Sequence, residues 1–171
     1  MMKNYDEPMC PDESSSKICE VEEINLKEVI RELLESESFA VLSTQGQGQP
    51  YASLISFYST PDLKNIVFAT SKDTRKFSLI SKSNPVALLV DDRSKTPPSV
   101  NKISAATVTG KAQVIEDVKE RRKWADLLVE KHPYLDSFVK APSTAVILIH
   151  IYRYFYVRRF QEVFEWNPHQ K

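Results

Sequence analysis

The stretch Val67-Phe68-Ala69-Thr70-Ser71-Lys72-Asp73-Thr74-Arg75-Lys76 (residues 67–76) carries the most informative pattern in this chain. An apolar run ends near its middle and polar residues follow. Phe77 and Ile80 then recur at helical spacing. The pattern predicts a strand that leads through a turn into a helix. The first backbone N–H groups of such a helix have no partner within it, so they favour an anion.

Two cations at the start of this helix indicate which anion. Arg75 and Lys76 place positive charge where the helix dipole disfavours it, unless an anion binds nearby. Arg can bind phosphate oxygens through two parallel hydrogen bonds, and Thr70, Ser71 and Thr74 add hydroxyl donors. The segment predicts a phosphate-binding turn. On the residues alone the alternative stays open, in which the hydroxyls cap the helix and the cations are solvated.

Outward from this segment, strand patterns dominate the chain. Apolar or alternating runs occupy 39–44, 51–59, 65–70, 86–90, 103–115 and 144–160, while helical spacing occupies 25–37, 73–82 and 117–131. Most connections are too short for the crossovers that parallel strands need. We therefore predict a mainly β (α+β) fold, a six-stranded antiparallel split β-barrel with peripheral helices, spanning residues 24–171. Residues 1–23 are predicted to be a flexible tail, and 161–171 a second tail.

The composition of the chain limits the classes of partner that we expect it to bind. The chain has 171 residues with 23 basic and 23 acidic side chains, so no net field favours nucleic acid or a membrane surface. The most apolar run, 145–151, is too short to span a bilayer. Both cysteines, Cys10 and Cys19, lie in the polar tail without zinc-site spacing, which predicts free thiols and no metal site. A cytoplasmic protein is expected.

The order of these elements resembles the pyridoxamine 5'-phosphate oxidase family, whose members bind flavin mononucleotide (FMN) in a split barrel. The resemblance rests on a strand ending in Phe68-Ala69-Thr70, an Arg-Lys pair five residues later, and Asn84-Pro85 before an apolar strand. It implies that Arg75 and Lys76 bind the FMN phosphate beside Ala69 and Thr70. It also implies that one strand lies along the flavin ring, namely Ser53, Leu54, Ile55, Ser56 and Phe57.

The sequence departs from the family pattern at substrate positions. Phe57 stands where the oxidase has a lysine that contacts the substrate phosphate, and Ala105 is the nearest match to a flavin-contacting glutamine. The resemblance therefore implies an FMN-dependent oxidoreductase of an unknown small-molecule redox substrate, and not a true pyridoxamine-phosphate oxidase. The alternatives are a flavin-binding or redox-sensing protein without turnover, or a haem-binding or deazaflavin F420-binding member of the same fold.

The last strand and the residues after it predict a homodimer. Tyr152, Tyr154 and Tyr156 alternate along one expected strand face, which suits a buried interface. Family members bind FMN at a two-fold interface, and Trp166 is the candidate for lining the partner's flavin. Among the histidines, His132 is expected to cap a helix or face solvent, and His150 is expected to lie in the core.

Overall fold

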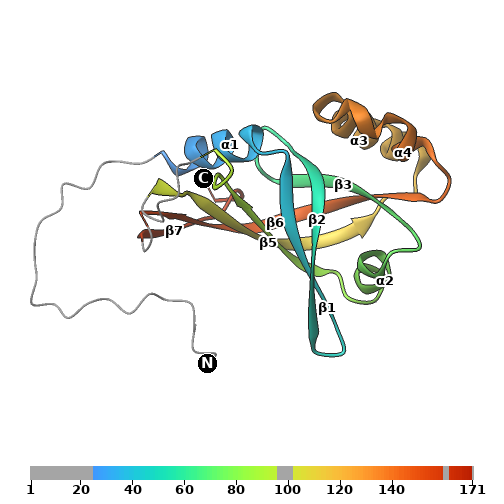
Figure 1. Cartoon of the computed structure of the whole chain (residues 1–171), viewed down its shortest axis with the longest axis horizontal. Helices are drawn as coiled ribbons and strands as arrows, with labels where there is room; N and C mark the ends of the chain where they lie inside the picture. The colour runs from blue at the N-terminus through green and yellow to red at the C-terminus, as the bar shows by residue number, and fades with distance from the viewer. Residues whose placement is uncertain (1–24, 96–101, 160–161, 171) are drawn as a thin grey trace, which may run out of the picture.

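The computed structural model describes residues 25–95, 102–159 and 162–170. The predicted tail at 1–23, with Cys10 and Cys19, lies outside the described residues. The elements follow one another as α1 (Leu26–Ser36), β1 (Phe39–Gly46), β2 (Gln49–Ser59), β3 (Asn65–Ser71), α2 (Arg75–Lys82), β4 (Pro85–Asp91), β5 (Ala105–Val114), α3 (Val118–Lys131), the 3-10 turn η2 (Pro133–Leu135), α4 (Asp136–Lys140), β6 (Thr144–Arg158) and β7 (Glu162–Trp166) (Figure 1).

The strands form one antiparallel sheet in the order β3-β2-β1-β4-β5-β6-β7, and a further β3–β6 pairing closes strands β1 to β6 into a barrel. The predicted six-stranded split β-barrel with peripheral helices is thereby confirmed. The long strand β6 makes the closure, because residues 144–150 pair with β3 while the stretch 147–157 pairs with β5. The prediction of a tail after residue 160 is wrong at Glu162–Trp166, since β7 pairs with the end of β6.

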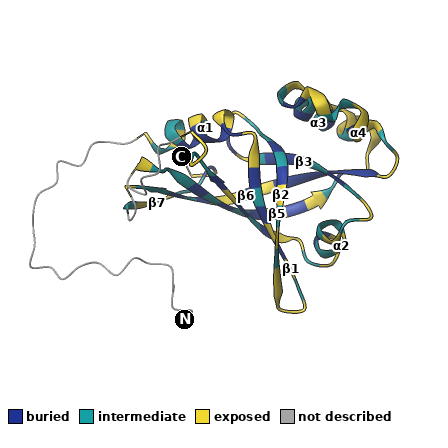
Figure 2. Ribbon diagram, viewed as in Figure 1, coloured by how far each residue is buried: buried dark blue, intermediate teal, exposed yellow. Residues whose placement is uncertain are grey.

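The helices cover different parts of the barrel. Helix α1 buries Ile30, Leu33 and Leu34 against the barrel core. Helices α3 and α4 lie on the outside of β3 and β6, over a second apolar cluster that includes Val67 and Leu148 (Figure 1). Buried residues concentrate in the barrel and beneath these helices, whereas the tip of the β1–β2 hairpin is exposed (Figure 2). None of the described helices is both long enough and apolar enough to cross a membrane.

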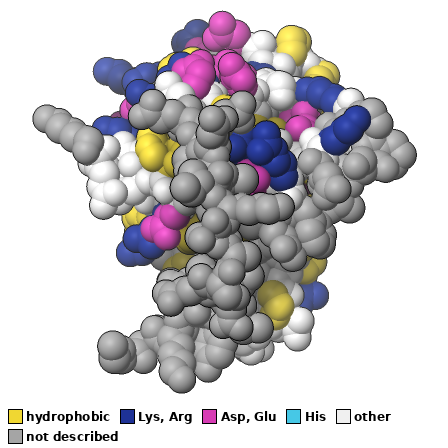
Figure 3. All heavy atoms as spheres, turned by 90° about the vertical axis from the view of Figure 1, so that its left-hand side faces the viewer, with side chains coloured by type: hydrophobic (Ala, Val, Ile, Leu, Met, Phe, Trp, Pro, Cys, Tyr) yellow, Lys and Arg dark blue, Asp and Glu magenta, His cyan; other side chains and the backbone are white. Residues whose placement is uncertain are grey.

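At the β7 end of the molecule, acidic and basic side chains are interspersed (Figure 3). Ion pairs contribute to this pattern, with Arg153 2.7 Å from Glu165 and Arg158 2.8 Å from Glu162 across the β6–β7 pair. Opposite charges facing each other across two strands stabilise their pairing modestly. Acidic and basic side chains described on this face therefore lie in pairs, in keeping with the equal numbers of acidic and basic residues in the sequence.

A β-bulge in β6 changes the predicted tyrosine face. The β5–β6 register shifts between Thr109 and Gly110, so that Arg153 and Ile151 lie opposite them and Tyr152 is the extra residue. Gly110 is required there, because a Cβ on it would lie 2.3 Å from the carbonyl oxygen of His150. Tyr152 is therefore exposed while Tyr154 points into the core. The prediction that three tyrosines share one interface-forming face is wrong.

Burial accounts for the other tyrosines. The Tyr154 hydroxyl donates to the carbonyl oxygen of Leu63 at 2.8 Å, and burial raises the pKa of Tyr154 well above its ordinary value. Tyr156 is also buried. Both side chains fill the barrel, where the phenol end of Tyr154 satisfies the carbonyl of the buried loop residue Leu63. Neither is available to a second subunit.

Lys131, the last residue of α3, fastens that helix to the end of α1. Its Nζ donates to the carbonyl oxygens of Leu34 at 2.8 Å and Glu37 at 2.7 Å, and lies 4.3 Å from the centre of the Phe57 ring. Cations are favoured at the C-terminal carbonyls of a helix. Burial lowers the pKa of Lys131 to about 8, since desolvation disfavours the charged form. A cavity of about 310 Å³ opens beside it, between α1, β2 and α3.

We expect the free energy of unfolding to depend on the protonation of Lys131. Because the pKa of Lys131 is about 8 in the folded protein and has its ordinary value of 10.5 in the unfolded chain, the unfolded chain binds more protons between those two pH values. The free energy of unfolding contributed by Lys131 should therefore rise as pH increases from about 8 to 10.5. Lys131→Met should cost about 1–3 kcal/mol at pH 7, because it leaves two carbonyl groups unpaired.

Urea denaturation of the wild type and of Lys131→Met, repeated from pH 7 to 10.5, tests this expectation. The gap in unfolding free energy between the two proteins should widen with pH. Lys119→Met, on the exposed face of the same helix, is the matched control and should keep the wild-type slope. Parallel pH profiles for the wild type and Lys131→Met would contradict the assignment.

Candidate functional site

Hydroxyl groups hold the turn between β3 and α2. Thr74 is the N-cap of α2, with its Oγ1 accepting from the backbone N–H of Phe77 at 3.3 Å and donating to the carbonyl oxygen of Ser71 at 2.8 Å. Thr70, which is buried, lies 3.0 Å from Thr74 between their hydroxyl oxygens. The backbone N–H of Asp73 donates to Ser71 Oγ. The hydroxyls predicted as phosphate donors therefore shape the turn itself.

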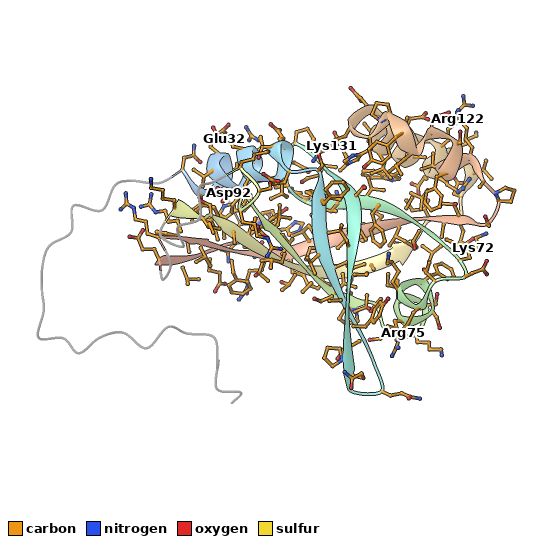
Figure 4. All side chains as sticks on the ribbon, in the orientation of Figure 1. Glu32, Lys72, Arg75, Asp92, Arg122 and Lys131 are labelled. Carbon is orange, nitrogen blue, oxygen red and sulfur yellow. The ribbon has the colours of Figure 1, made fainter. Side chains whose placement is uncertain are left out.

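The two cations that follow lie against β2. The guanidinium carbon of Arg75 is 5.1 Å from the centre of the Tyr51 ring, and Lys76 Nζ is 3.5 Å from the carbonyl oxygen of Leu54. The first turn of α2 contains no acidic residue. Partial burial lowers the pKa of Lys76. Figure 4 shows Arg75 beside the hairpin, on the side of the barrel away from Lys131. The structure thus brings α2 and β2 together.

Strand β2 has a free backbone edge at this place. It pairs with β1 from Gln49 to Ser56, but with β3 only over Phe57, Tyr58 and Ser59. In an antiparallel pair, alternate residues direct their backbone N–H and C=O groups away from the partner strand. The two-residue turn at Gln47 and Gly48, both with positive φ, makes Gly46 and Gln49 a hydrogen-bonded pair. Counting from that pair, the outward-directed residues are Ala52, Leu54 and Ser56.

The predicted flavin-strand residues therefore divide into two groups. The side chains of Ile55 and Phe57 are buried in the barrel core, and Ser53 Oγ is buried without a hydrogen-bond partner among the described residues. Leu54, at 63% exposure, and the partly exposed Ser56 point outward. Phe57 thus serves the fold through its side chain, and its burial explains why a charged group has no place there.

The remaining predicted residues lie apart. On β3, Ala69 packs on the apolar cluster beneath α3, and Thr70 points into the barrel. Trp166 lies on β7, with its ring 5.6 Å from that of Tyr154, so it packs on its own barrel. Strand β7 and helix α2 lie at opposite ends of the sheet (Figure 1). Within one chain, Trp166 is not part of the site formed by Arg75, Lys76 and β2.

A buried histidine beside Ser56 was not predicted. His132 is the C-cap residue of α3, as expected, but its side chain is buried and not solvated. Its Nε2 lies 2.8 Å from the carbonyl oxygen of Phe57, and its Nδ1 lies 3.3 Å from the Tyr134 hydroxyl. That hydroxyl lies 2.9 Å from Ser56 Oγ. Burial is the main cause that lowers the pKa of His132, and the Lys131 charge adds to it.

The sequence offers little signal for this network. His132 and Tyr134 flank Pro133 in a short turn, and only the packing of α3 against β2 brings that turn to Ser56. The second histidine prediction is wrong, since His150 is exposed on β6. Its Nδ1 lies 2.9 Å from Asn65 Oδ1, and its Nε2 lies 3.2 Å from Gln113 Oε1. Side-chain amides from the two flanking strands therefore surround His150.

Solved structures share this fold. A haem-binding protein from Mycobacterium smegmatis matches with a TM-score of 0.73 and 13% identity, over 83% of this chain and 57% of that chain. General stress protein 26 from Bacillus anthracis matches with a TM-score of 0.64 and 18% identity, over 84% and 99%. A Clostridium acetobutylicum protein related to general stress protein 26, of the pyridoxinephosphate oxidase family, matches with a TM-score of 0.65 and 18% identity, over 82% and 93%.

At these identities the likeness concerns the fold, and this chain spans little more than half of the haem-binding protein. No curated protein matches the sequence. Residues 26–158 match the family model described as pyridoxamine 5'-phosphate oxidase, a range that runs from the start of α1 to the end of β6 and includes the whole Arg75–Lys76 and β2 region. The chain therefore belongs to the pyridoxamine 5'-phosphate oxidase family.

Proposed function

We propose that the chain binds FMN between two copies of itself and acts as a flavin-dependent oxidoreductase. The observation that carries this proposal is the placement of Arg75 and Lys76, at the start of a helix without acidic residues in its first turn, against the free edge of β2. One end of the site suits a phosphate and the other a planar polar ring. FMN is a ligand that combines these two groups.

The phosphate end follows from electrostatics. Two cations beside the partial positive charge of a helix start repel that charge, and a bound anion would convert the repulsion into attraction. Arg75 is exposed and Lys76 is half-buried, so a phosphate can reach both. Because hydrogen bonds of Thr70 and Thr74 already hold the turn in place, the backbone N–H groups at the start of α2 would not need to be ordered when a phosphate binds.

The ring end follows from the backbone. The outward-directed N–H and C=O groups of Ala52, Leu54 and Ser56 alternate along the free edge of β2. The polar edge of a flavin ring also alternates hydrogen-bond donors and acceptors. Bound FMN would supply the redox chemistry. The chain would bind the phosphate through α2, orient the ring through β2, and exclude water through the exposed Leu54 side chain and a second subunit.

A second copy of the chain is the proposed cover for an apolar strip on the outer face of the sheet. Val41 pairs with Leu54 on one side and with Leu89 on the other, so the three form one row across β2, β1 and β4. Leu54 is 63% exposed, Leu89 38% and nearby Phe39 50%. Exposed apolar side chains grouped in this way are typical of interfaces. Since Leu54 also borders the free edge of β2, the interface and the flavin site would be continuous.

Trp166 remains a proposed contributor to the partner's site, because the strand that carries it, β7, lies at the other end of the molecule from α2 of the same chain (Figure 1). The substrate is proposed to be a small redox-active molecule other than pyridoxamine phosphate, since Phe57 is buried where the oxidase presents a lysine. A cytoplasmic homodimer without nucleic-acid or membrane partners is the proposed physiological form.

Haem is the second candidate, because a haem-binding protein shares the fold. The histidines support flavin instead. His132 and His150 each have both ring nitrogens within hydrogen-bonding distance of other groups, and the Nε2 of His169 lies 2.8 Å from the carbonyl oxygen of Ile151. The visible spectrum of the purified protein distinguishes flavin, deazaflavin and haem. Reduction of bound flavin by NAD(P)H in the presence of an acceptor distinguishes an enzyme from a non-catalytic flavin sensor.

Arg75→Ala should weaken FMN binding by about tenfold or more, because a hydrogen bond to a charged group contributes about 1.5–3 kcal/mol. Riboflavin, which lacks the phosphate, should bind the wild type and Arg75→Ala about equally. Fluorescence titration measures both. Lys82→Ala, in the last turn of the same helix, is the charge-matched control and should bind FMN as the wild type does. An equal loss for FMN and riboflavin would assign Arg75 to the fold.

Leu89→Glu should convert the dimer to a monomer, because it places a charge at the β4 end of the apolar row. Light scattering measures the mass, and the monomer should release FMN if the site needs both chains. Val118→Glu is the control, since Val118 is 79% exposed on α3, away from this row, and should leave the dimer intact. A Leu89→Glu dimer with full FMN affinity would refute this interface.

A further inference from the structure

A hydrogen-bond network of three side chains beside the free edge of β2 has a fixed donor-to-acceptor direction. It runs from Ser56 Oγ to the Tyr134 hydroxyl at 2.9 Å, to His132 Nδ1 at 3.3 Å, and ends with His132 Nε2 at 2.8 Å from the carbonyl oxygen of Phe57. Only the last acceptor is unambiguous from its chemistry, because a carbonyl oxygen cannot donate. The Phe57 carbonyl therefore determines the hydrogen-bond direction of the whole network.

The histidine sets the first step. Nε2 must carry the proton that is donated to the Phe57 carbonyl. That carbonyl lies on the β1 side of β2, one residue beyond the last β1 pair, Phe39 with Ser56, so His132 takes the place of a strand partner. Burial lowers the pKa of His132 and keeps the ring neutral at neutral pH. In the neutral ring Nδ1 has no proton, so it accepts.

The two hydroxyls follow from that step. Tyr134 has a single hydroxyl hydrogen, which it donates to His132 Nδ1, so toward Ser56 its oxygen accepts. Ser56 then donates its own single hydrogen to Tyr134. Both hydroxyl hydrogens are donated within the network, so only lone pairs remain on the Ser56 and Tyr134 oxygens. A ligand approaching Ser56 and Tyr134 therefore meets acceptors only.

The placement of this pair makes it accessible to a ligand. Ser56 lies at the end of the free edge of β2, one alternation after Leu54, whose carbonyl oxygen is 3.5 Å from Lys76 Nζ. Tyr134 is 65% exposed. The ring of His132 lies beneath it, with the two ring centres 5.7 Å apart at an angle of 71°. The buried His132 ring fixes the direction of the hydrogen bonds, and the exposed Tyr134 hydroxyl presents its lone pairs to a ligand.

We propose that Ser56 and Tyr134 form an acceptor-only pair that selects the N–H group on the polar edge of the flavin ring. This inference rests on the proposed FMN site and adds a specificity-determining role for two side chains. In the oxidised ring the imide N–H is the ring's donor, and a ligand carrying a methyl group or a carbonyl oxygen at that position would leave the pair without a partner. Such a loss weakens binding substantially, since an acceptor that the bound ring covers is left unsatisfied.

The probes are FMN and its N3-methylated analogue, which differ only in the imide hydrogen. Fluorescence titration of the dimeric wild type should give at least about tenfold tighter binding of FMN. In Ser56→Ala one of the two acceptors is gone, and in Tyr134→Phe the Ser56 hydroxyl is free to turn and donate. In both variants the ratio of the two affinities should fall to within about threefold, chiefly through weaker binding of FMN.

Tyr152→Phe is the matched control, because Tyr152 is also an exposed tyrosine but lies on the bulge of β6; its affinity ratio should equal that of the wild type. Tyr134→Phe should remain cooperatively folded, with a melting transition lowered by the loss of the hydrogen bond to His132 Nδ1. A thermal melt recorded beside the titration separates a binding effect from misfolding. An unchanged ratio in Ser56→Ala and Tyr134→Phe would overturn the acceptor pair while leaving FMN binding in place. A wild type that binds neither flavin would overturn the proposed function itself and, with it, this inference.

Discussion

The pairing of β3 with β6 is the constraint on which the rest of this structure depends. All seven residues of β3 pair with β6, whereas only Phe68, Val67 and Ile66 pair with β2. Closing the barrel through β6 draws β3 away from β2 and leaves the first part of β2 unpaired on one side. Unpaired backbone groups at an edge are costly unless they are solvated or bound. The same closure that buries the core therefore creates the edge to which a polar ring can bind.

Helix α2 is placed by this closure as well. It begins where β3 ends, so the separation of β3 from β2 sets the position of its first turn. Gly46 allows the approach, because a Cβ there would lie 2.4 Å from Cδ2 of Leu79 on α2. With the helix against the hairpin, Arg75 and Lys76 have β2 as their neighbour instead of solvent alone. The proposed phosphate and ring positions thus become two ends of one feature.

On the other side of β2, the ends of α1 and α3 meet. Lys131 binds the last carbonyls of α1, and the next residue, His132, binds the carbonyl of Phe57. Consecutive residues therefore hold the end of α3 to two elements, α1 and β2, and both have a lowered pKa caused mainly by burial. The hydrogen-bond direction that Ser56 presents outside is determined by this buried contact inside.

The sequence by itself determined the strand and helix pattern, since alternation and helical spacing are local properties. It also determined the cationic helix start at Arg75 and Lys76, because caps and charges are read from neighbouring residues. The tertiary structure alone decided which side of β2 is free, that Phe57 and Tyr154 face the core, and that His132 is buried against β2. The bulge at Gly110 reversed the expected tyrosine face, since one extra residue shifts every later side chain to the opposite side. These features depend on contacts between residues tens of positions apart, which no local pattern encodes.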